Sequence, residues 1–263
     1  MKSIILRSKK RILSSRHGLF RSQSQEGLEF DELVEYDYQS DAKKIDWHSF
    51  ARTGKLYQKR FVNEQARQIL IAPILTGSLL FGYERLLSHK VLEVVSLLSF
   101  SALLGKDQLH LAPIIEDRAH LYHPKNFLDL EQRLQEISKI TLLGKAFRFD
   151  CATFFAYPKS MIIFVGDFLY EPDLALLATK HDVVCIVLRQ SLIPFSQPLE
   201  MVDNITLHKR GLTLGHKAIR HYTSKRQAHH QTLFQKWRQA GIDYTVIEDE
   251  PIFQKLQLFF GRR

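Results

Sequence analysis

Acidic, aromatic and basic side chains alternate closely near the start of the chain, and their types suit an ion pair or a binding surface. Arg52 carries a planar fork of donors that matches a carboxylate in bidentate geometry, and Asp46 or Asp41 can supply that carboxylate. The simpler interpretation is a structural ion pair that fixes a chain crossing. The alternative is a docking surface for a partner protein, with Trp47, Tyr57 and Arg52 as anchors of the kinds enriched at binding hot spots.

Apolar runs and amphipathic segments alternate over most of the remaining chain. Short runs of apolar, often β-branched residues predict strands over residues 68–74, 108–115, 160–165, 182–188, 204–209 and 243–247. Apolar residues at three- and four-residue steps, with turn and cap signals, predict helices over residues 84–104, 126–140, 145–156, 173–179, 214–240 and 252–260. This alternation predicts an α/β fold with a mostly parallel sheet and helices on both of its faces.

In such a sheet, ligands bind beyond the carboxyl ends of strands, at the point where the strand order reverses. Two loops follow strands in this way. The first comprises residues 74–78 and the second comprises residues 166–171. We therefore expect ligand binding, if any, at these two loops.

Other patterns with chemical potential are weaker. Cys151 and Cys185 lie in apolar contexts, which predicts buried thiols in a reducing compartment and not catalytic nucleophiles. Asp46 and His48 resemble an acid-base pair, but we expect them in an extended segment that supplies no nucleophile. No serine lies in the G-x-S-x-G pattern of α/β-hydrolases.

The region after residue 210 also carries polar patterns without the spacing of a known site. Gly211 to Lys217 fails the spacing of a phosphate-binding loop. The histidines of the following helix lack metal-ligand spacing, so we expect a solvated helix face. They are His216, His221, His229 and His230.

The composition is that of a soluble globular protein, with 263 residues, 45% hydrophobic and 25% charged. The net charge of +9 and the pI of about 9.5 call for an acidic partner, which can be an acidic protein surface, an anionic membrane or a nucleic acid. Basic residues concentrate at both ends, which predicts a solvated face or a flexible arm. A nucleic-acid-binding protein is one alternative function, although no recognition-module signature supports it.

No continuous apolar run reaches the roughly 18–20 residues needed to cross a bilayer, so we expect no transmembrane segment. The first residues lack the apolar core and cleavage site of a signal peptide, and their basic, amphipathic character suits contact with a membrane surface. The expected compartment is the cytoplasm.

The aromatic and polar pattern near the start also resembles a family signature. Glu35, Tyr36 and Asp41 lead into Ile45-Asp46-Trp47 and then Ala51-Arg52-Thr53-Gly54. This order resembles the signature R-E-Y-x-x-G-D-x-x-R-x-I-D-W-x-x-x-A-R-T-G of a bacterial family named only "domain of unknown function 58". The resemblance implies a von Willebrand factor A-like (Rossmann-like) domain, often associated with MoxR-type AAA+ ATPases.

The resemblance also implies that the two loops belong to neighbouring strands and face each other. At the first loop, an A domain carries the metal-binding motif D-x-S-x-S, whereas this chain reads Ile74-Leu-Thr76-Gly-Ser78. Thr76 and Ser78 keep the hydroxyls, Asp167 is the remaining carboxylate, and Thr141 is a weak candidate for the additional threonine. The motif is degenerate, and we expect no bound metal or cofactor.

These implications define the expected organisation: a basic arm over residues 1–26, a signature extension over 27–67 and the A-like domain over 68–263. The expected function is a non-enzymatic interaction module that acts as an adaptor for a MoxR-type ATPase in the assembly or maturation of a protein complex. Two alternatives remain, a Mg²⁺-dependent ligand-binding domain and a nucleic-acid-binding protein. The signature also departs from the family at Val34, Ser40 and Lys44.

Overall fold

The computed structural model describes residues 4, 6, 28–36, 45–63, 67–82, 85–192, 199–212 and 215–263. The chain divides into two compact units, one formed by Met1–Ser14 with Arg67–Arg263, and the other formed by Ser15–Ala66. The expected N-terminal arm thus includes residues of the larger unit. Ile4 and Leu6 are each 2% exposed and belong to its apolar core.

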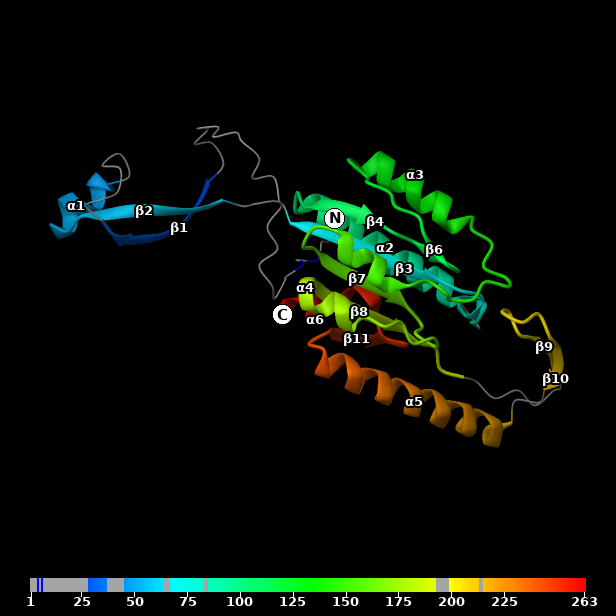
Figure 1. The fold of residues 1–263 in the computed structure, drawn as a ribbon. Helices are drawn as coiled ribbons and strands as arrows, with labels where there is room; N and C mark the ends of the chain where they lie inside the picture. The colour runs from blue at the N-terminus through cyan, green and yellow to red at the C-terminus, as the bar shows by residue number, and fades with distance from the viewer. Residues whose placement is uncertain are drawn as a thin grey trace. The chain divides into compact units, whose positions relative to one another are not determined.

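The larger unit is built on a mostly parallel sheet, seven-stranded in the described part of the chain (Figure 1). Its spatial order is β11-β8-β7-β3-β5-β6, and β4 also pairs with β3. The strands are β3 (Gln68–Leu75), β4 (Gln108–Leu111), β5 (Ile114–Ile115), β6 (Arg118–Ala119), β7 (Met161–Gly166), β8 (Asp182–Leu188) and β11 (Asp243–Ile247). All neighbouring pairs are parallel except β5 and β6. The α/β class with a mostly parallel sheet is confirmed, and the fold is Rossmann-like.

Helices cover both faces of this sheet because its central strands are buried along their whole length, as in parallel sheets generally. One apolar cluster joins Ile69 and Ile71 to α2 (Leu87–Leu104), α3 (Phe127–Ser138) and α6 (Ile252–Gly261). A second cluster joins Leu70 and Ala72 to α4 (Ala175–Lys180), α5 (His216–Gln239) and the 3₁₀ helix η3 (Cys151–Ala156). Alternate residues of β3 therefore face opposite clusters, as the two-residue period of a strand requires.

Two predicted elements differ from the structure. Residues 145–156 were expected to form one helix, but only η3 is helical and the preceding residues are irregular. The carbonyl of Lys145 accepts from Gly77 N at 2.8 Å, and the amide of Arg148 donates to Glu116 O at 2.9 Å. These backbone groups are therefore hydrogen-bonded to distant loops and not within a helix.

The strand expected over residues 204–209 is a turn between β9 (Leu199–Val202) and β10 (Lys209–Leu212). Asp203 Oδ1 accepts from the amides of Ile205 and Thr206 at 2.9 and 3.1 Å. Asp side chains favour such turns because they replace backbone partners.

Helix α2 is the one helix in the described residues that is long and apolar enough to cross a membrane by length and composition. In this fold its buried residues, including Val91, Val94 and Leu98, pack in the core against β3. Core helices of globular domains pass the same test, so the expectation of no transmembrane segment stays a prediction.

The smaller unit contains an antiparallel pair of strands, β1 (Leu28–Glu35) and β2 (Tyr57–Asn63), and helix α1 (Trp47–Thr53) between them in sequence. The pairing continues one residue past the end of β1, where Tyr36 N donates to Leu56 O at 3.0 Å. The signature residues Glu35 to Gly54 therefore run from the end of β1 to the end of α1, within a hairpin that contains an inserted helix.

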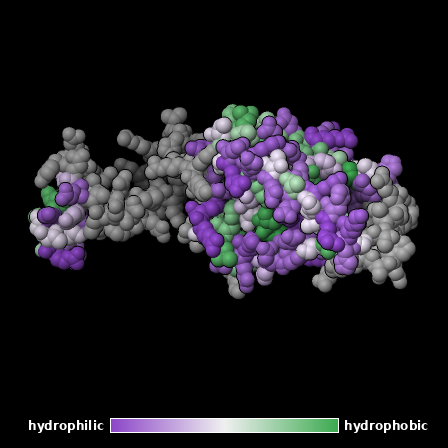
Figure 2. All heavy atoms as spheres, turned by 90° about the horizontal axis from the view of Figure 1, so that it is seen from below, coloured by the Kyte–Doolittle hydropathy of each residue, from purple (hydrophilic) through white to green (hydrophobic). Residues whose placement is uncertain are grey.

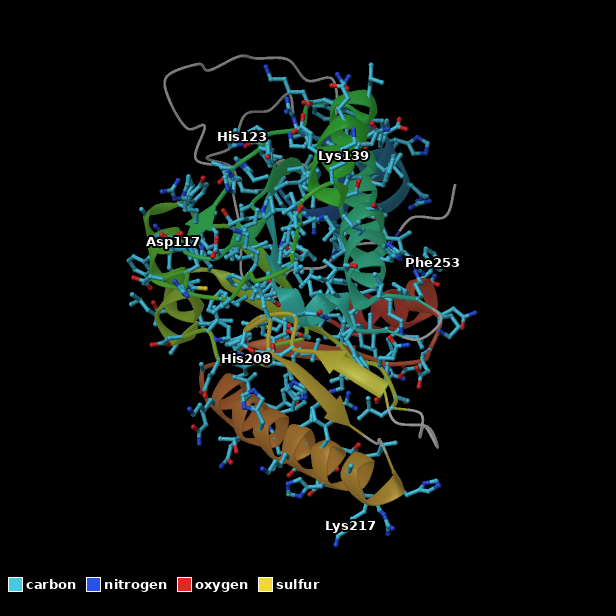
Figure 3. All side chains as sticks on the ribbon, turned by 90° about the vertical axis from the view of Figure 1, so that its right-hand side faces the viewer. Asp117, His123, Lys139, His208, Lys217 and Phe253 are labelled. Atoms are coloured by element: carbon cyan, nitrogen blue, oxygen red, sulfur yellow. The ribbon has the colours of Figure 1, made fainter. Side chains whose placement is uncertain are left out.

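The surface of the larger unit is mixed. Figure 2 shows hydrophobic and hydrophilic residues interspersed over the face in view. The basic residues Lys217, Arg220 and Lys225 of α5 are exposed, and Lys217 points away from the domain (Figure 3). This part of the expected solvated basic face is confirmed.

Candidate functional site

The carboxyl ends of β3 and β7 border one crevice. The chain leaves β3 through α2 to reach β4 and β5 on one side, and β7 pairs with β3 on the other side. The strand order therefore reverses at β3, which is where open α/β sheets bind ligands. Ser78 and Asp167 line the same cavity, and Thr76 Oγ1 lies 2.7 Å from Ser78 Oγ. The predicted convergence of the two loops is confirmed.

Gly77 allows the first loop to turn into the short helix η2 (Gly77–Leu80). A Cβ atom at this position would lie 2.2 Å from the backbone oxygen of Asn204, far inside van der Waals contact. The Gly77 amide donates to Lys145 O at 2.8 Å. Two distant loops thus fix the loop that carries Thr76 and Ser78, and only glycine fits between them.

Asp167 is buried at the end of β7, with 6% of its surface exposed. Its Oδ1 accepts from Leu169 N at 3.4 Å, whereas Oδ2 has no hydrogen-bond partner among the described residues. Burial raises the pKa of this carboxyl, and the nearby Ser78 hydroxyl and the Leu169 amide only partly offset that effect. Ser78, whose hydroxyl also lies 2.7 Å from Thr76 Oγ1, lines the same cavity as Asp167.

Two adjacent histidines of α5 hold the backbone of the second loop. His229 Nε2 lies 2.9 Å from Phe168 O, and His230 Nε2 lies 3.1 Å from Asp167 O. His230 is 1% exposed and stacks on Phe234, so the expectation that it lies on a solvated face is wrong. The signal was present in the sequence, because His230 precedes Leu233, Phe234 and Trp237 at helical spacing.

Burial and the neighbouring Arg189 lower the pKa of His230 to about 4. The ring is therefore neutral near pH 7. Because a carbonyl oxygen can only accept, we assign the ring proton to Nε2, which leaves Nδ1 as a lone-pair acceptor. Nδ1 has no partner among the described residues.

Arginines complete the wall of the crevice. Arg226 donates to Gln190 O at 2.8 Å and pairs with Glu248 Oε1 at 3.0 Å. Arg189 follows β8, stands 5.6 Å from the centre of the Phe234 ring, and forms no ion pair with any described residue. The cavity has a volume of about 40 Å³, and its polar lining includes Ser78, Asp167, Arg189, Tyr222, Arg226 and His230.

This set of donors does not fit a divalent cation. Mg²⁺ takes oxygen ligands and usually one or two carboxylates. Asp167 is the one carboxyl group among the described residues that line the crevice, and Ile74 stands at the leading position of the motif. Across the described chain, no group of three or more His, Cys, Asp or Glu side chains is placed to hold a metal. Thr141, the candidate for a further ligand, is exposed and lies outside the cavity lining.

Helix α1 of the smaller unit presents aromatic rings to solvent. Asp46 precedes the helix, is 8% exposed and accepts from Ser49 Oγ at 2.7 Å. Gly54 ends it in the left-handed region at φ 69°, and its amide donates to Phe50 O at 2.8 Å. Trp47 is 62% exposed and Phe50 is 40% exposed, with ring centres 6.1 Å apart in an edge-to-face contact.

The other signature predictions have mixed outcomes. Arg52 is exposed and forms no ion pair with a described residue, while Asp41 lies outside the described residues. Tyr57 is half-buried at the start of β2, where its carbonyl accepts from Asp46 N at 2.8 Å. Asp46 and His48 were expected in an extended segment, but Asp46 stands at the N-terminal boundary of α1, where its side chain accepts from Ser49 Oγ, and His48 is exposed on the first turn.

The buried thiols match their sequence contexts. Cys151 and Cys185 are both free and buried. Burial raises the pKa of Cys151 to about 12 and also raises that of Cys185, so neither is a thiolate near pH 7.

The fold and the crevice together define a Rossmann-like α/β protein with a polar crevice at the switch point of its sheet. Residues 32–233 match the family described as "Protein of unknown function DUF58", which is more than half of the chain. The chain therefore belongs to this family. The matched region begins in β1 and ends in α5, so it includes both α1 and the crevice. No curated protein matches the chain.

Proposed function

We propose that this chain is a non-enzymatic protein-interaction module of the cytoplasm. It acts as an adaptor for a MoxR-type AAA+ ATPase in the assembly or maturation of a protein complex. Its larger unit is proposed to be von Willebrand factor A-like, with a degenerate metal motif. The ATPase and the A-like arrangement come from the resemblance of the signature, and the features below support a binding role.

The observation that carries the proposal is the exposed aromatic pair on α1. Trp47 and Phe50 lie on a short helix whose two ends are fixed by Asp46 and Gly54. Large aromatic side chains held rigidly at the surface lose little entropy on binding, and Trp is enriched at binding hot spots. A solvated ring pair of this kind favours contact with a partner.

The crevice supports binding over catalysis because of the groups it contains. Its lining offers one buried carboxyl, two arginines and a histidine that is neutral near pH 7. The described lining contains no cysteine, and Ser78 bonds to Thr76 and not to a histidine base. Nucleophilic catalysis needs a nucleophile within reach of its base.

The test is binding of the purified full chain to the MoxR-type ATPase of the same organism, with and without a non-hydrolysed ATP analogue. We expect saturable binding in at least one nucleotide state. Trp47→Ala should weaken it about 30-fold, which corresponds to about 2 kcal/mol at a hot spot.

A matched control is Leu128→Ala, which removes an apolar side chain that is 67% exposed on α3. This variant should bind as the wild type does. The adaptor proposal fails if no binding occurs in either nucleotide state. Equal losses for Trp47→Ala and Leu128→Ala would instead remove α1 as the docking element.

A further inference from the structure

Strand β6 forms one edge of the large sheet in the described part of the chain (Figure 1). It pairs with β5 in the antiparallel sense, with Ile114 opposite Ala119. The pairing continues past the end of β6, because Leu111 and Tyr122 exchange backbone hydrogen bonds at 2.9 and 2.8 Å. The paired edge therefore extends over residues 118–122.

The backbone groups of this edge alternate in direction. In an antiparallel pair, every second residue turns its N–H and C=O toward the partner strand, and the residues between them turn theirs away. The amides of His120 and Tyr122 donate to carbonyls of the neighbouring segment, residues 111–113, at 3.0 and 2.8 Å, so they face inward. The backbone groups of Ala119 and Leu121 therefore face outward, and they have no hydrogen-bond partner among the described residues.

A cavity with an aromatic lining borders the same edge. Its volume of about 450 Å³ falls within the usual range of ligand pockets, about 300–1,000 Å³. Asp117, at the start of the edge, lies at the periphery of the larger unit (Figure 3). The lining joins residues 117–121 to three aromatic side chains, Phe149, Phe154 and Tyr157. The ring of Phe154 contacts the other two, with centres 5.3 and 6.0 Å away.

The edge and the cavity together match an extended peptide segment. A strand that is added to a sheet edge pairs its backbone with the outward groups, and its alternate side chains enter pockets beside the edge. Aromatic rings favour a further ring in edge-to-face or offset contact. The Asp117 and Arg118 side chains are 69% and 79% exposed and 3.9 Å apart, so opposite charges meet at the rim and favour neither an acidic nor a basic segment.

We propose that the edge over residues 118–122 binds an extended segment of a partner protein as an added strand, with one aromatic side chain of that segment in the cavity. Ala119 and Leu121 supply the backbone contacts, and Phe149 and Tyr157 contact the aromatic side chain. The inference goes beyond the proposed docking of an ATPase, because it concerns a second surface, in the larger unit, and does not involve α1.

The probe is the capped peptide acetyl-Thr-Val-Phe-Val-Thr-amide, which has high strand propensity and one aromatic ring. It is added to the isotopically labelled full chain, and amide hydrogen exchange is followed by NMR. In the free chain, we expect slow exchange at His120 and Tyr122 and fast exchange at Ala119 and Leu121. Saturating probe should slow exchange at Ala119 and Leu121 at least tenfold.

Two isomers of the probe test the strand geometry. One carries N-methyl groups on both valines, and the other carries them on the phenylalanine and the second threonine. Because only alternate amides of an added strand face the edge, one isomer should bind like the parent probe and the other at least tenfold more weakly. Equal binding of the two isomers would overturn the inference.

A pair of variants tests the cavity. Phe149→Ala should weaken binding of the probe at least tenfold, because it removes part of the aromatic lining. Phe155→Ala is the matched control, since Phe155 is 37% exposed on η3 and lies outside the lining, and it should bind the probe as the wild type does. The unfolding midpoint of each variant shows that it is folded. Equal binding by the two folded variants would overturn the placement of the aromatic side chain in the cavity.

The remaining outcomes separate other occupants of the edge. Slow exchange at Ala119 and Leu121 without the probe, or protection that rises with protein concentration, would show that the chain or a second copy covers the edge. Either result would overturn the inference, as would the absence of protection by the probe. The two proposals fail separately, because ATPase binding without probe binding would keep only the adaptor role, and the reverse result would keep only the edge site.

Discussion

The crevice and helix α1 use opposite strategies for presenting polar and apolar groups. In the crevice, Asp167 and His230 are buried, and each has one side-chain polar atom without a hydrogen-bond partner among the described residues. On α1, the polar Asp46 is hydrogen-bonded and nearly buried, while the apolar Trp47 is exposed. The first region loses stability through buried polar atoms without partners, and the second loses the hydrophobic stabilisation that burial of the aromatic ring would give.

This difference teaches what each region can recognise. Desolvated polar atoms discriminate strongly between ligands, because a wrong ligand leaves them without partners. An exposed aromatic ring supplies contact area and tolerates varied partners. We therefore expect the crevice to determine specificity and α1 to contribute affinity.

The largest expected effect on stability comes from a substitution that disrupts the first loop of the crevice. Gly77→Ala places a Cβ 2.2 Å from Asn204 O and should lower the free energy of unfolding by about 3 kcal/mol, the upper end of common overpacking costs. Urea denaturation measures this change. Gly215→Ala is the matched control, since its Cβ meets nothing within 4 Å, and its effect should be small. Equal effects of the two variants would show that the loop is not tightly confined.

The second effect concerns pH. Arg189, His229 and Arg226 all face His230, and together with burial they lower its pKa to about 4, against 6.5 when exposed. The unfolded chain takes up this proton first on acidification, so stability is present above pH 6.5 and is lost as the pH falls toward 4. The loss at pH 5 relative to pH 8 should be about 2 kcal/mol.

His230→Phe should remove that share of the pH dependence, as measured by urea midpoints at the two pH values. His221→Phe is the control, because His221 is exposed on the same helix. If His230→Phe lost as much stability between pH 8 and pH 5 as the wild type, the pKa of His230 would not be lowered in the folded protein.

A smaller effect of opposite sign is expected for Asp167→Asn. Burial raises the pKa of Asp167, so ionisation costs stability as the pH rises through the folded pKa. The variant should be more stable than the wild type at pH 7 by about 1 kcal/mol, the lower end of the cost of a buried polar atom without a partner. The gain should vanish once both forms are neutral at low pH. A destabilised variant at pH 7 would mean that Asp167 is structural.

The smallest stability effect is expected on α1. Trp47→Ala removes a side chain that is 62% exposed, so unfolding free energy should change by less than about 0.5 kcal/mol. Thermal denaturation measures it. A large loss would show that the ring packs inside its own unit and is not available to a partner.

Much of the sheet was predictable because its strands are short, apolar and buried throughout. The strands ending at Leu75 and Gly166 were found from such runs, and the rule for parallel sheets then picked out the loops that follow them. That the two loops face each other was an implication of the family resemblance, and Ser78 and Asp167 do line one cavity. Local pattern and tertiary environment agree in these segments.

The predictions from sequence were wrong or incomplete where contacts with distant residues decide the local structure. Residues 145–156 were expected to be one helix, but the backbone of Lys145 and Arg148 bonds to Gly77 and Glu116, and only residues 151–156 form a short 3₁₀ helix. Arg189 carries no motif, and only the end of β8 places it beside the crevice. His230 was missed because its neighbours in sequence are polar, although its helical neighbours are apolar.

The central claim is that the exposed aromatic pair on α1 docks the partner protein. The most direct measurement is the affinity of the full chain for the ATPase, with and without a non-hydrolysed ATP analogue, for the wild type and for Trp47→Ala. The account predicts saturable wild-type binding in at least one nucleotide state and about 30-fold weaker binding of the variant. Binding that Trp47→Ala leaves unchanged, in whichever nucleotide state it occurs, would contradict it.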